Sequence, residues 1–348
     1  MNNLDTFLEK DDIWVLSITA TGRCNCNCSY CHFYASRDRK RYMFDITDDL
    51  FDSYVDLIKY IQDKYHKKLQ VRFSGGEPLV IGDRLFELSK RLYNKTGIEP
   101  YVLTNGKALD SKVIEKSANS HIKSYLVSIE NPFDQSLGAP KTKEVLEKIK
   151  SLNSDEVSVL PAIMIIKNDS FKHLYRIADY VFSEINMLPS FAELTYQAYQ
   201  SPTEKELQDL YENVRNIASE FYGKTPIRIF PYVSPELYAN GQRNFLSELD
   251  IENSIGISKE NIEEIASKMF SKLNKSYQLN PCKNEECDWY NDCKIIKWLW
   301  FYPTDTLSRE EKLNDFCRFK KVINNALYDG ITQKIGDIDD TTIVASEQ

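Results

Sequence analysis

The segment Cys24-Asn25-Cys26-Asn27-Cys28-Ser29-Tyr30-Cys31 places four of the eight cysteines of this 348-residue chain within eight positions. An apolar run with the alternation of a strand, Ile13 to Ala20, comes directly before it. Residues 21–23 form the predicted turn out of that strand. We therefore expect the cysteines on a loop at the carboxyl end of a first strand, where barrels of alternating strands and helices place their chemistry.

Two kinds of metal site compete for these cysteines. A closed zinc site needs a second pair of thiolates to surround one ion, yet no cysteine occurs between residues 31 and 282. Cys24, Cys28 and Cys31 have the short spacing typical of iron–sulfur ligands. Three thiolates bind three irons of a cubane cluster and leave the fourth iron open for a small ligand. A zinc knuckle, or a chance cluster of reduced thiols, is the alternative.

The spacing Cys24-x-x-x-Cys28-x-x-Cys31, with Tyr30 before the last cysteine, resembles the signature of radical S-adenosylmethionine (radical SAM) enzymes. The resemblance implies a [4Fe–4S] cluster whose open iron binds the amino and carboxylate groups of S-adenosyl-L-methionine (AdoMet). An electron from a donor such as flavodoxin or ferredoxin would then cleave AdoMet to methionine and a 5′-deoxyadenosyl radical, which abstracts a substrate hydrogen. We interpret Cys26, an addition to the signature, as a thiol that faces away from the cluster; exchange with Cys24 or Cys28 as a ligand is the alternative.

Composition limits the possible classes of protein. Hydrophobic residues make up 42% and charged residues 28% of the chain, as in ordinary globular proteins. The net charge of −8 and the pI near 5.3 argue against a nucleic-acid partner. No apolar run approaches the ~20 residues of a membrane span, and the polar segment Met1 to Asp12 does not resemble a signal peptide. We therefore expect a cytoplasmic protein with no membrane partner, whose cysteines are metal ligands.

Strand and helix patterns alternate along the first two thirds of the chain. Because strands separated by helices pair in parallel, the pattern predicts an α/β fold, and six such units suit the partial (β/α)6, TIM-like barrel of the radical SAM family. The predicted strands are residues 13–20, 69–74, 101–104, 124–129, 157–166 and 191–196. The predicted helices are residues 48–64, 83–93, 111–118, 142–152, 170–185 and 203–222.

The turn after the second predicted strand is Gly75-Gly76-Glu77-Pro78. Two glycines allow a backbone to approach a ligand closely, and Pro78 ends the turn; an ordinary tight turn between strand and helix is the alternative. The four residues resemble the Gly-Gly-Glu-Pro element of radical SAM enzymes. By that resemblance, the backbone of the turn and Glu77 hold the amino group of AdoMet.

Polar residues also follow the third and fourth predicted strands. By their position in the family, Ser128 and Glu130 are assigned to the ribose or carboxylate side of AdoMet. Each is also a residue type that commonly caps strands, which is the structural alternative. The residues expected to bind the cofactor are Tyr30, Gly75, Gly76, Glu77, Pro78, Asn105, Ser128 and Glu130.

The other four cysteines lie near the end of the chain, at Cys282, Cys287, Cys293 and Cys317. Four thiolates close a cluster completely, and an all-cysteine zinc site is the alternative at this spacing. The set resembles the ligands of an auxiliary [4Fe–4S] cluster in SPASM and twitch domains, where a distant last cysteine leads into a helix, here residues 318–327. The chain departs from that pattern in its first gap, which is four residues where the usual gap is two, and in lacking the ligands of a further auxiliary cluster.

These patterns divide the chain into two predicted domains. Residues 1–230 form the radical SAM barrel, and residues 231–348 form a smaller, cysteine-rich and mostly helical Fe–S domain. The polar and acidic residues 337–348 are expected to fray.

The resemblance implies an enzyme that modifies a substrate, and a ribosomally made peptide is the first expectation. The product would carry a thioether bond, a carbon–carbon cross-link, an epimerised residue or an oxidised side chain. Because the barrel begins near residue 13, a separate leader-binding protein or the C-terminal part would recognise a peptide leader. A small molecule such as an aminocyclitol or a nucleotide is the alternative substrate. A zinc-binding interaction protein is the more distant alternative.

Overall fold

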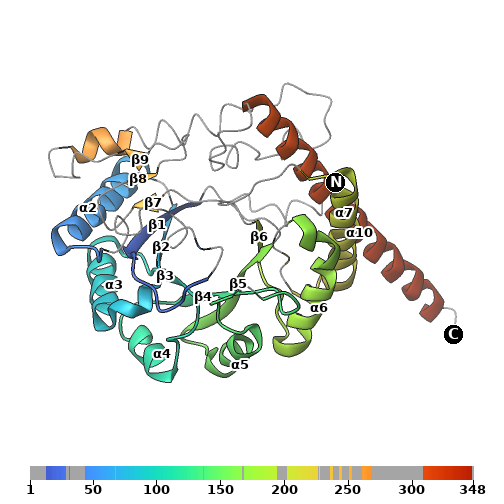
Figure 1. The fold of residues 1–348 in the computed structure, drawn as a ribbon, viewed down its shortest axis with the longest axis horizontal. Coiled ribbons are helices and arrows are strands. Elements are labelled where there is room, and N and C mark those ends of the chain that lie inside the picture. The colour runs from blue at the N-terminus through green and yellow to red at the C-terminus, as the bar shows by residue number, and fades with distance from the viewer. Residues whose placement is uncertain are drawn as a thin grey trace.

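The computed structural model forms a curved parallel sheet with helices on its outer side (Figure 1). It describes residues 13–28, 31, 44–66, 68–135, 137–166, 168–193, 202–225, 227, 236–237, 243–244, 251–252, 261–267 and 309–346. Six parallel strands lie next to one another in chain order: β1 (Ile13–Thr21), β2 (Lys68–Gly75), β3 (Tyr101–Thr104), β4 (Ser124–Ile129), β5 (Ser158–Ile166) and β6 (Phe191–Glu193). The predicted α/β fold, a partial TIM-like barrel, is confirmed.

A helix follows each of these six strands, in the part of the sequence where helical periodicity predicts it. The helices are α2 (Asp48–Tyr65), α3 (Asp83–Thr96), α4 (Ser111–Ala118), α5 (Thr142–Leu152), α6 (Leu174–Ile185) and α7 (Glu204–Phe221). Short 3-10 turns precede α3 and α6, at η2 (Pro78–Ile81) and η3 (Asn168–His173). Local capping residues set the ends of the helices. Thr47 caps α2 by accepting a hydrogen bond from the Leu50 amide, and Gly97 ends α3 in the left-handed conformation.

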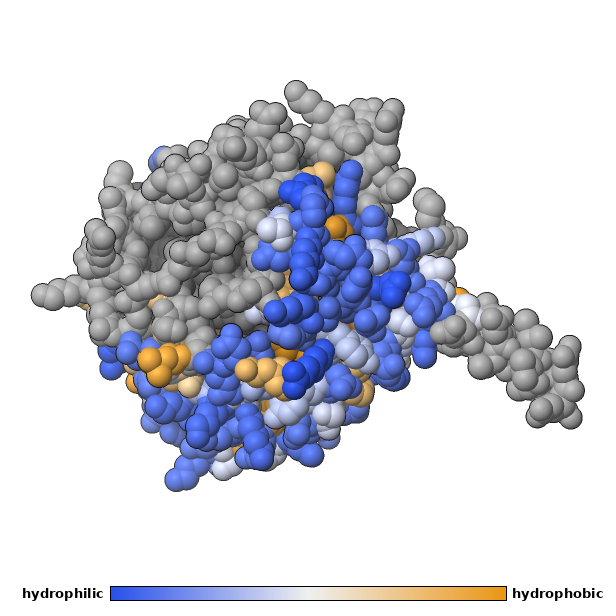
Figure 2. Space-filling model, turned by 45° about the vertical axis from the view of Figure 1, so that its right-hand side comes forward, coloured by the Kyte–Doolittle hydropathy of each residue, from blue (hydrophilic) through white to orange (hydrophobic). Residues whose placement is uncertain are grey.

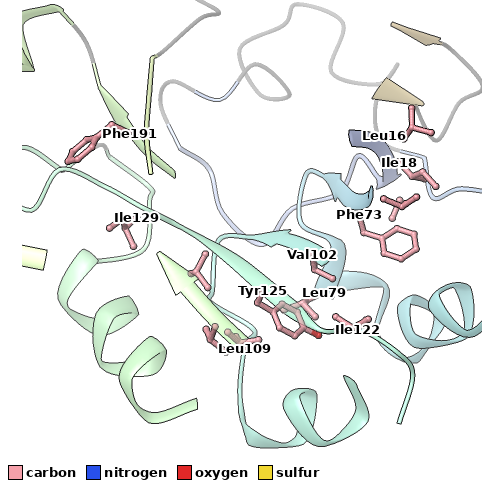
Figure 3. Close-up of a cluster of buried hydrophobic side chains, with 14 of the residues drawn as sticks. Leu16, Ile18, Phe73, Leu79, Val102, Leu109, Ile122, Tyr125, Ile129 and Phe191 are labelled. Carbon is pink, nitrogen blue, oxygen red and sulfur yellow. The ribbon is translucent and has the colours of Figure 1, made fainter. Parts of the chain in front are cut away.

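The two faces of the sheet differ in character. On the outer face Leu16, Ile18 and Phe73 are fully buried and lie together (Figure 3), and Phe73 stacks on Phe51 of α2 with ring centroids 6.2 Å apart. On the inner face the alternate positions carry polar groups, such as the buried hydroxyls of Ser17 and Ser74. Hydrophobic burial under the helices therefore stabilises the barrel, while the inner face keeps groups that can contact a ligand.

The sheet continues past β1 through strands that sequence patterns do not predict. β7 (Glu236–Leu237) pairs with β1 in parallel, and β8 (Arg243–Asn244) and β9 (Ile251–Glu252) follow in antiparallel pairing. Each is two residues long, which is too short for the alternation that marks a strand. They lie beyond residue 230, so described strands from both sides of the predicted domain division share one sheet.

A long C-terminal helix, α10 (Arg309–Ser346), packs against α7 (Figure 1). Its buried residues Phe319, Ile323 and Ala326 belong to the same hydrophobic core as the barrel. The prediction that residues 337–348 fray is wrong for residues 337–346, because the helix continues to Ser346. The predicted helix 318–327 is therefore only the middle of a longer one.

On the face of the molecule shown in Figure 2, the described residues are largely hydrophilic, with small scattered hydrophobic patches. Among the described helices, none has both the length and the apolar character of a membrane span.

Candidate functional site

The cysteine loop, residues 22–31, leaves β1 at the carboxyl end of the sheet, where the sequence predicts it. Cys24, Cys28 and Cys31 are partly buried, whereas Cys26 is buried with 8% of its surface exposed. The Cys31 amide donates a hydrogen bond to the Cys28 carbonyl (3.1 Å), which turns the end of the loop back on itself. Tyr30 lies outside the described residues.

The turn after β2 forms the first support of this loop. The Gly76 amide donates to the Thr21 carbonyl (2.9 Å), and the Glu77 amide donates to the Arg23 carbonyl (2.8 Å). A Cβ on Gly75 would lie 2.1 Å from the Thr21 carbonyl oxygen, and one on Gly76 would lie 2.3 Å from that of Arg23. The two glycines are therefore required by contact between two protein backbones, whatever ligand binds nearby.

Glu77 joins the ends of β2 and β3 from a fully buried position. Its Oε1 accepts hydrogen bonds from the Leu79 amide (3.0 Å) and the Thr104 hydroxyl (2.8 Å), and its Oε2 accepts one from the Asn105 amide (2.7 Å). Burial raises the pKa of Glu77, and these three donors oppose that effect. The carboxylate thus positions the turn, and its predicted contact with AdoMet stays a prediction.

The loop after β3 is the second support. Asn105 Nδ2 donates to Asn25 Oδ1 (2.8 Å) and lies 3.7 Å from the Cys24 sulfur. Lys107 Nζ donates to the Asn25 carbonyl (3.2 Å). Lys148 of α5 holds this loop in turn by donating to the carbonyls of Gly106 (3.0 Å) and Lys107 (2.8 Å). Sequence patterns indicate Asn105 but give no signal for either lysine.

Asp45 is a third support, which no sequence pattern indicates. It accepts two hydrogen bonds from the Arg23 guanidinium (2.9 and 2.6 Å) and one from the Thr21 hydroxyl (2.6 Å). Burial alone would raise the pKa of Asp45, but the hydrogen bonds from Arg23 and Thr21 outweigh it and lower the pKa below its usual value. The ionised side chain of Asp45 therefore holds Thr21 and Arg23 in place where the chain enters the cysteine loop.

The loop after β4 is a fourth support, and it contacts the second half of the cysteine loop. The Asn27 amide donates to the Gly138 carbonyl (3.4 Å), and the Cys28 sulfur lies 3.8 Å from the same oxygen. Residues 27 and 138 are far apart in sequence, so no local pattern predicts this contact.

The chemistry of the loop fits a cluster held by thiolates. Two N–H groups approach the Cys24 sulfur, the Cys26 amide at 3.4 Å and Asn105 Nδ2 at 3.7 Å, and such donors suit a thiolate ligand. Burial raises the pKa of Cys24 to about 11, so the sulfur is a neutral thiol until a metal deprotonates it. Within the described residues, no three Cys, His, Asp or Glu side chains converge on a single ion. A cubane instead binds each cysteine to a separate iron.

Cys26 lies beside Cys24, and its backbone amide donates a hydrogen bond to the Cys24 sulfur (3.4 Å). Burial raises the pKa of Cys26, and the Lys107 ammonium acts against that increase. Its assignment as a non-ligand stays a prediction.

The remaining predicted residues are placed as follows. Ser128 is partly buried at the carboxyl end of β4. Glu130 is buried just beyond, and its carbonyl accepts a hydrogen bond from the Thr142 hydroxyl (2.8 Å). Pro78 is buried at the first position of η2. The AdoMet contacts of all three stay predictions. Cys317 lies partly buried on α10, whereas Cys282, Cys287 and Cys293 lie outside the described residues.

Comparisons with known proteins agree with this geometry. Residues 18–181 match the family model of the Radical SAM superfamily. No curated protein sequence matches the chain. Among solved structures, anSMEcpe carrying a hexahistidine tag, with bound AdoMet, is 16% identical, with a TM-score of 0.64 over 92% of this chain and 98% of its own.

Two further solved structures are similar. Native anSMEcpe with bound AdoMet and Cp18Cys peptide is 17% identical, with a TM-score of 0.59 over 90% of this chain and 99% of its own. SuiB of Streptococcus suis bound to precursor peptide SuiA is 15% identical, with a TM-score of 0.51 over 75% of this chain and 66% of its own. At these identities the likeness shows a shared fold. The match to the Radical SAM superfamily model covers residues 18–181, slightly less than half of the chain.

Proposed function

We propose that this chain is a radical SAM enzyme that reductively cleaves AdoMet and then modifies a peptide substrate. The observation that carries the proposal is the cysteine loop itself. Its three signature cysteines lie on one loop at the carboxyl end of a parallel half-barrel, and four separate segments of the chain support that loop. Barrels of this kind place their active sites at that end.

The residues of the chain divide the work of binding the cofactors. Cys24, Cys28 and Cys31 would hold a [4Fe–4S] cluster, and the Asn105 amide group would orient the Cys24 sulfur. When bound, the cluster supplies the electron that splits AdoMet into methionine and a 5′-deoxyadenosyl radical. Glu77 keeps the Gly75–Gly76 turn against the cysteine loop, so the cluster and the AdoMet pocket share one rigid support.

The remaining polar groups at this end complete the proposed pocket. Ser128 and Glu130 follow the carboxyl end of β4, on the side proposed for the AdoMet ribose or carboxylate. Tyr30 and Pro78 belong to the proposed site by their place in the two motifs.

The inner face of the barrel offers the place for a substrate. Ser17 Oγ and Ser74 Oγ are 2.7 Å apart, and Arg72 Nε donates to Ser17 Oγ (3.2 Å). At the same level of the sheet, by strand register, lie Ser124 and Ser158, both partly exposed. Ser17 and Ser74 are buried and bonded to each other, so the partly exposed Ser124 and Ser158 are the serines of this set that could face a polar chain such as a peptide. Two of the structures that share the fold hold peptides.

We further propose that Cys282, Cys287, Cys293 and Cys317 bind one auxiliary [4Fe–4S] cluster, either as an electron acceptor or as a structural element. Cys317 supports this through its position, because α10 carries it against the core of the barrel. Four thiolates on one cluster would join the preceding segment to α10.

Anaerobic reconstitution with iron and sulfide tests the proposed function. The wild-type protein should bind about eight irons if both sites hold four-iron clusters, and with dithionite it should form 5′-deoxyadenosine from AdoMet. Replacing Cys24, Cys28 and Cys31 together by Ala should halve the iron and abolish 5′-deoxyadenosine. Cys26→Ala should keep most of both. A wild-type protein that binds zinc in place of iron, and forms no 5′-deoxyadenosine, would contradict the proposal.

A further inference from the structure

Gly138 brings the loop between β4 and α5 into contact with the second half of the cysteine loop. We call residues 130–141 the β4–α5 loop; the structure describes all of them except residue 136. Gly138 has a φ of +83°, and a Cβ at this position would lie 2.2 Å from the Asn27 carbonyl oxygen. Both the left-handed backbone and the close approach therefore require glycine.

The β4–α5 loop is itself fixed at its other end. The Asn131 side chain accepts a hydrogen bond from the Phe133 amide (2.9 Å), which shapes the start of the loop. The Phe133 ring packs against α6, where the Arg176 guanidinium lies 3.9 Å from the ring centroid and the Tyr180 ring meets it edge to face at 5.8 Å. The loop therefore reaches the cysteine loop from an anchored base.

The supports of the cysteine loop fall on different halves of it. Contacts from Asp45, Gly76, Glu77, Asn105 and Lys107 meet residues 21–25. The contact from Gly138 meets Asn27 and Cys28. Two of the three signature cysteines lie in this second half, so its position decides whether they can reach the same cluster as Cys24.

We propose that Gly138 is a positioning residue that seats Cys28 for cluster binding, and this rests on the proposed function. Binding to iron would remove the proton of the Cys28 thiol, and the sulfur would then no longer donate to the Gly138 carbonyl. The hydrogen bond from the Asn27 amide to that carbonyl then remains, and it holds the backbone of the loop in place. Gly138 thereby acts on the cluster through the cysteine loop and touches neither AdoMet nor substrate.

The test compares Gly138→Ala with Gly223→Ala. Gly223 has nearly the same φ, +78°, but no atom lies within 4 Å of a Cβ built there, so it carries the backbone strain without the collision. Iron release to a chelator is measured on reconstituted protein, and the iron retained by the triple Cys24/Cys28/Cys31→Ala variant is subtracted. Gly138→Ala should release the remaining iron roughly tenfold faster than wild type, because overpacking displaces the loop.

A spectroscopic signature accompanies this measurement. Addition of AdoMet to the reduced wild-type protein should change its electron paramagnetic resonance (EPR) spectrum, and in Gly138→Ala this change should be weakened. Gly223→Ala should match wild type in both measurements. If the two glycine variants release iron at equal rates and respond equally to AdoMet, Gly138 has no positioning role.

Thiol labelling of the iron-free protein gives a readout that is independent of the cluster. Alkylation of Cys28, measured by mass spectrometry relative to Cys317, should be faster in Gly138→Ala than in wild type or Gly223→Ala. Phe133→Ala removes the contacts of the β4–α5 loop with α6 but keeps Gly138, and it should also speed the alkylation of Cys28. This variant replaces Gly138→Ala in the test if Gly138→Ala does not fold. Unchanged Cys28 labelling in both variants would overturn the proposal. A wild-type protein that neither binds iron nor cleaves AdoMet would overturn the proposed function instead.

Discussion

The cysteine loop after β1 and Cys317 on α10 are held in place by different forces. The loop is supported by hydrogen bonds that Asp45 accepts and Asn105 donates, and by backbone contacts at Gly76 and Gly138. α10, in contrast, is held by apolar packing, with buried residues Phe319, Ile323 and Ala326 against the core.

The difference indicates different tasks. Hydrogen bonds are directional and fix atoms in place, whereas burial of apolar surface is non-directional and supplies most of the stability. Substitutions around the loop should therefore damage cluster and AdoMet binding as well as stability. Substitutions at the interface of α10 should lower the free energy of unfolding alone.

Glu77→Gln should have a larger effect than the substitutions of Gly330 and Asp45 described below. The carboxylate accepts three hydrogen bonds from buried donors, and an amide group would place its own N–H against one of them. We expect a loss of about 2–3 kcal/mol of stability and weaker AdoMet binding because the turn shifts. Urea unfolding and equilibrium binding of AdoMet measure the two effects. Thr104→Val, which removes only one of the donors, should show a smaller loss in both.

If Glu77→Gln weakens AdoMet binding with no loss of stability, the carboxylate contacts AdoMet directly. That result would restore the assignment made from the family motif. It would remove Glu77 from the supports of the cysteine loop.

Gly330→Ala should affect stability alone. A Cβ on Gly330 would lie 2.3 Å from the Arg215 carbonyl oxygen of α7, so the helices must separate, at a cost of roughly 1–2 kcal/mol. Gly336→Ala on the same helix is the control, because no atom lies within 4 Å of a Cβ there. Thermal unfolding should separate the two variants. Equal melting temperatures would show that α10 does not depend on this close contact.

Asp45→Asn should have the smallest effect on the free energy of unfolding, and the size of that effect should depend on pH. The pKa of Asp45 is lowered in the folded protein, so its contribution is present above the unfolded value of about 3.9 and is lost as the pH falls through the folded value. At neutral pH the variant should lose roughly 0.5–1 kcal/mol, as is usual for a partly exposed ion pair. Urea unfolding from about pH 5 down to about pH 2, the range that contains the unfolded and the lowered folded pKa, should show its stability falling less steeply than that of wild type. Parallel curves would exclude this role.

Much of the barrel follows from local patterns. Alternating apolar residues predict β3 and β4 at their observed bounds, and helical periodicity does the same for α4 and α5. β7 to β9 escape prediction because two-residue strands have no period. The last turns of α10 escape it because acidic residues such as Asp337 and Asp339 indicate a solvated end, although the helix continues through them.

The site divides in the same way. The cysteine spacing and the Gly75–Gly76 turn are local signals, and they predict where ligands gather. Other supports act through contacts that form only when the chain folds, as Asp45, Lys107 and Gly138 do. No local sequence pattern therefore predicts their roles. The motifs predict the ligands, and the fold supplies their supports.

The most direct test of the central claim is to detect AdoMet on the cluster held by the cysteine loop. Electron–nuclear double resonance of the reduced protein, with AdoMet labelled by ¹⁷O in its carboxylate and ¹⁵N in its amino group, measures contact with the open iron. We expect hyperfine coupling from both labels in wild type and in Cys26→Ala, and none in Cys24→Ala. Iron-loaded wild type without coupling from either label, or Cys24→Ala with full coupling, would contradict the account.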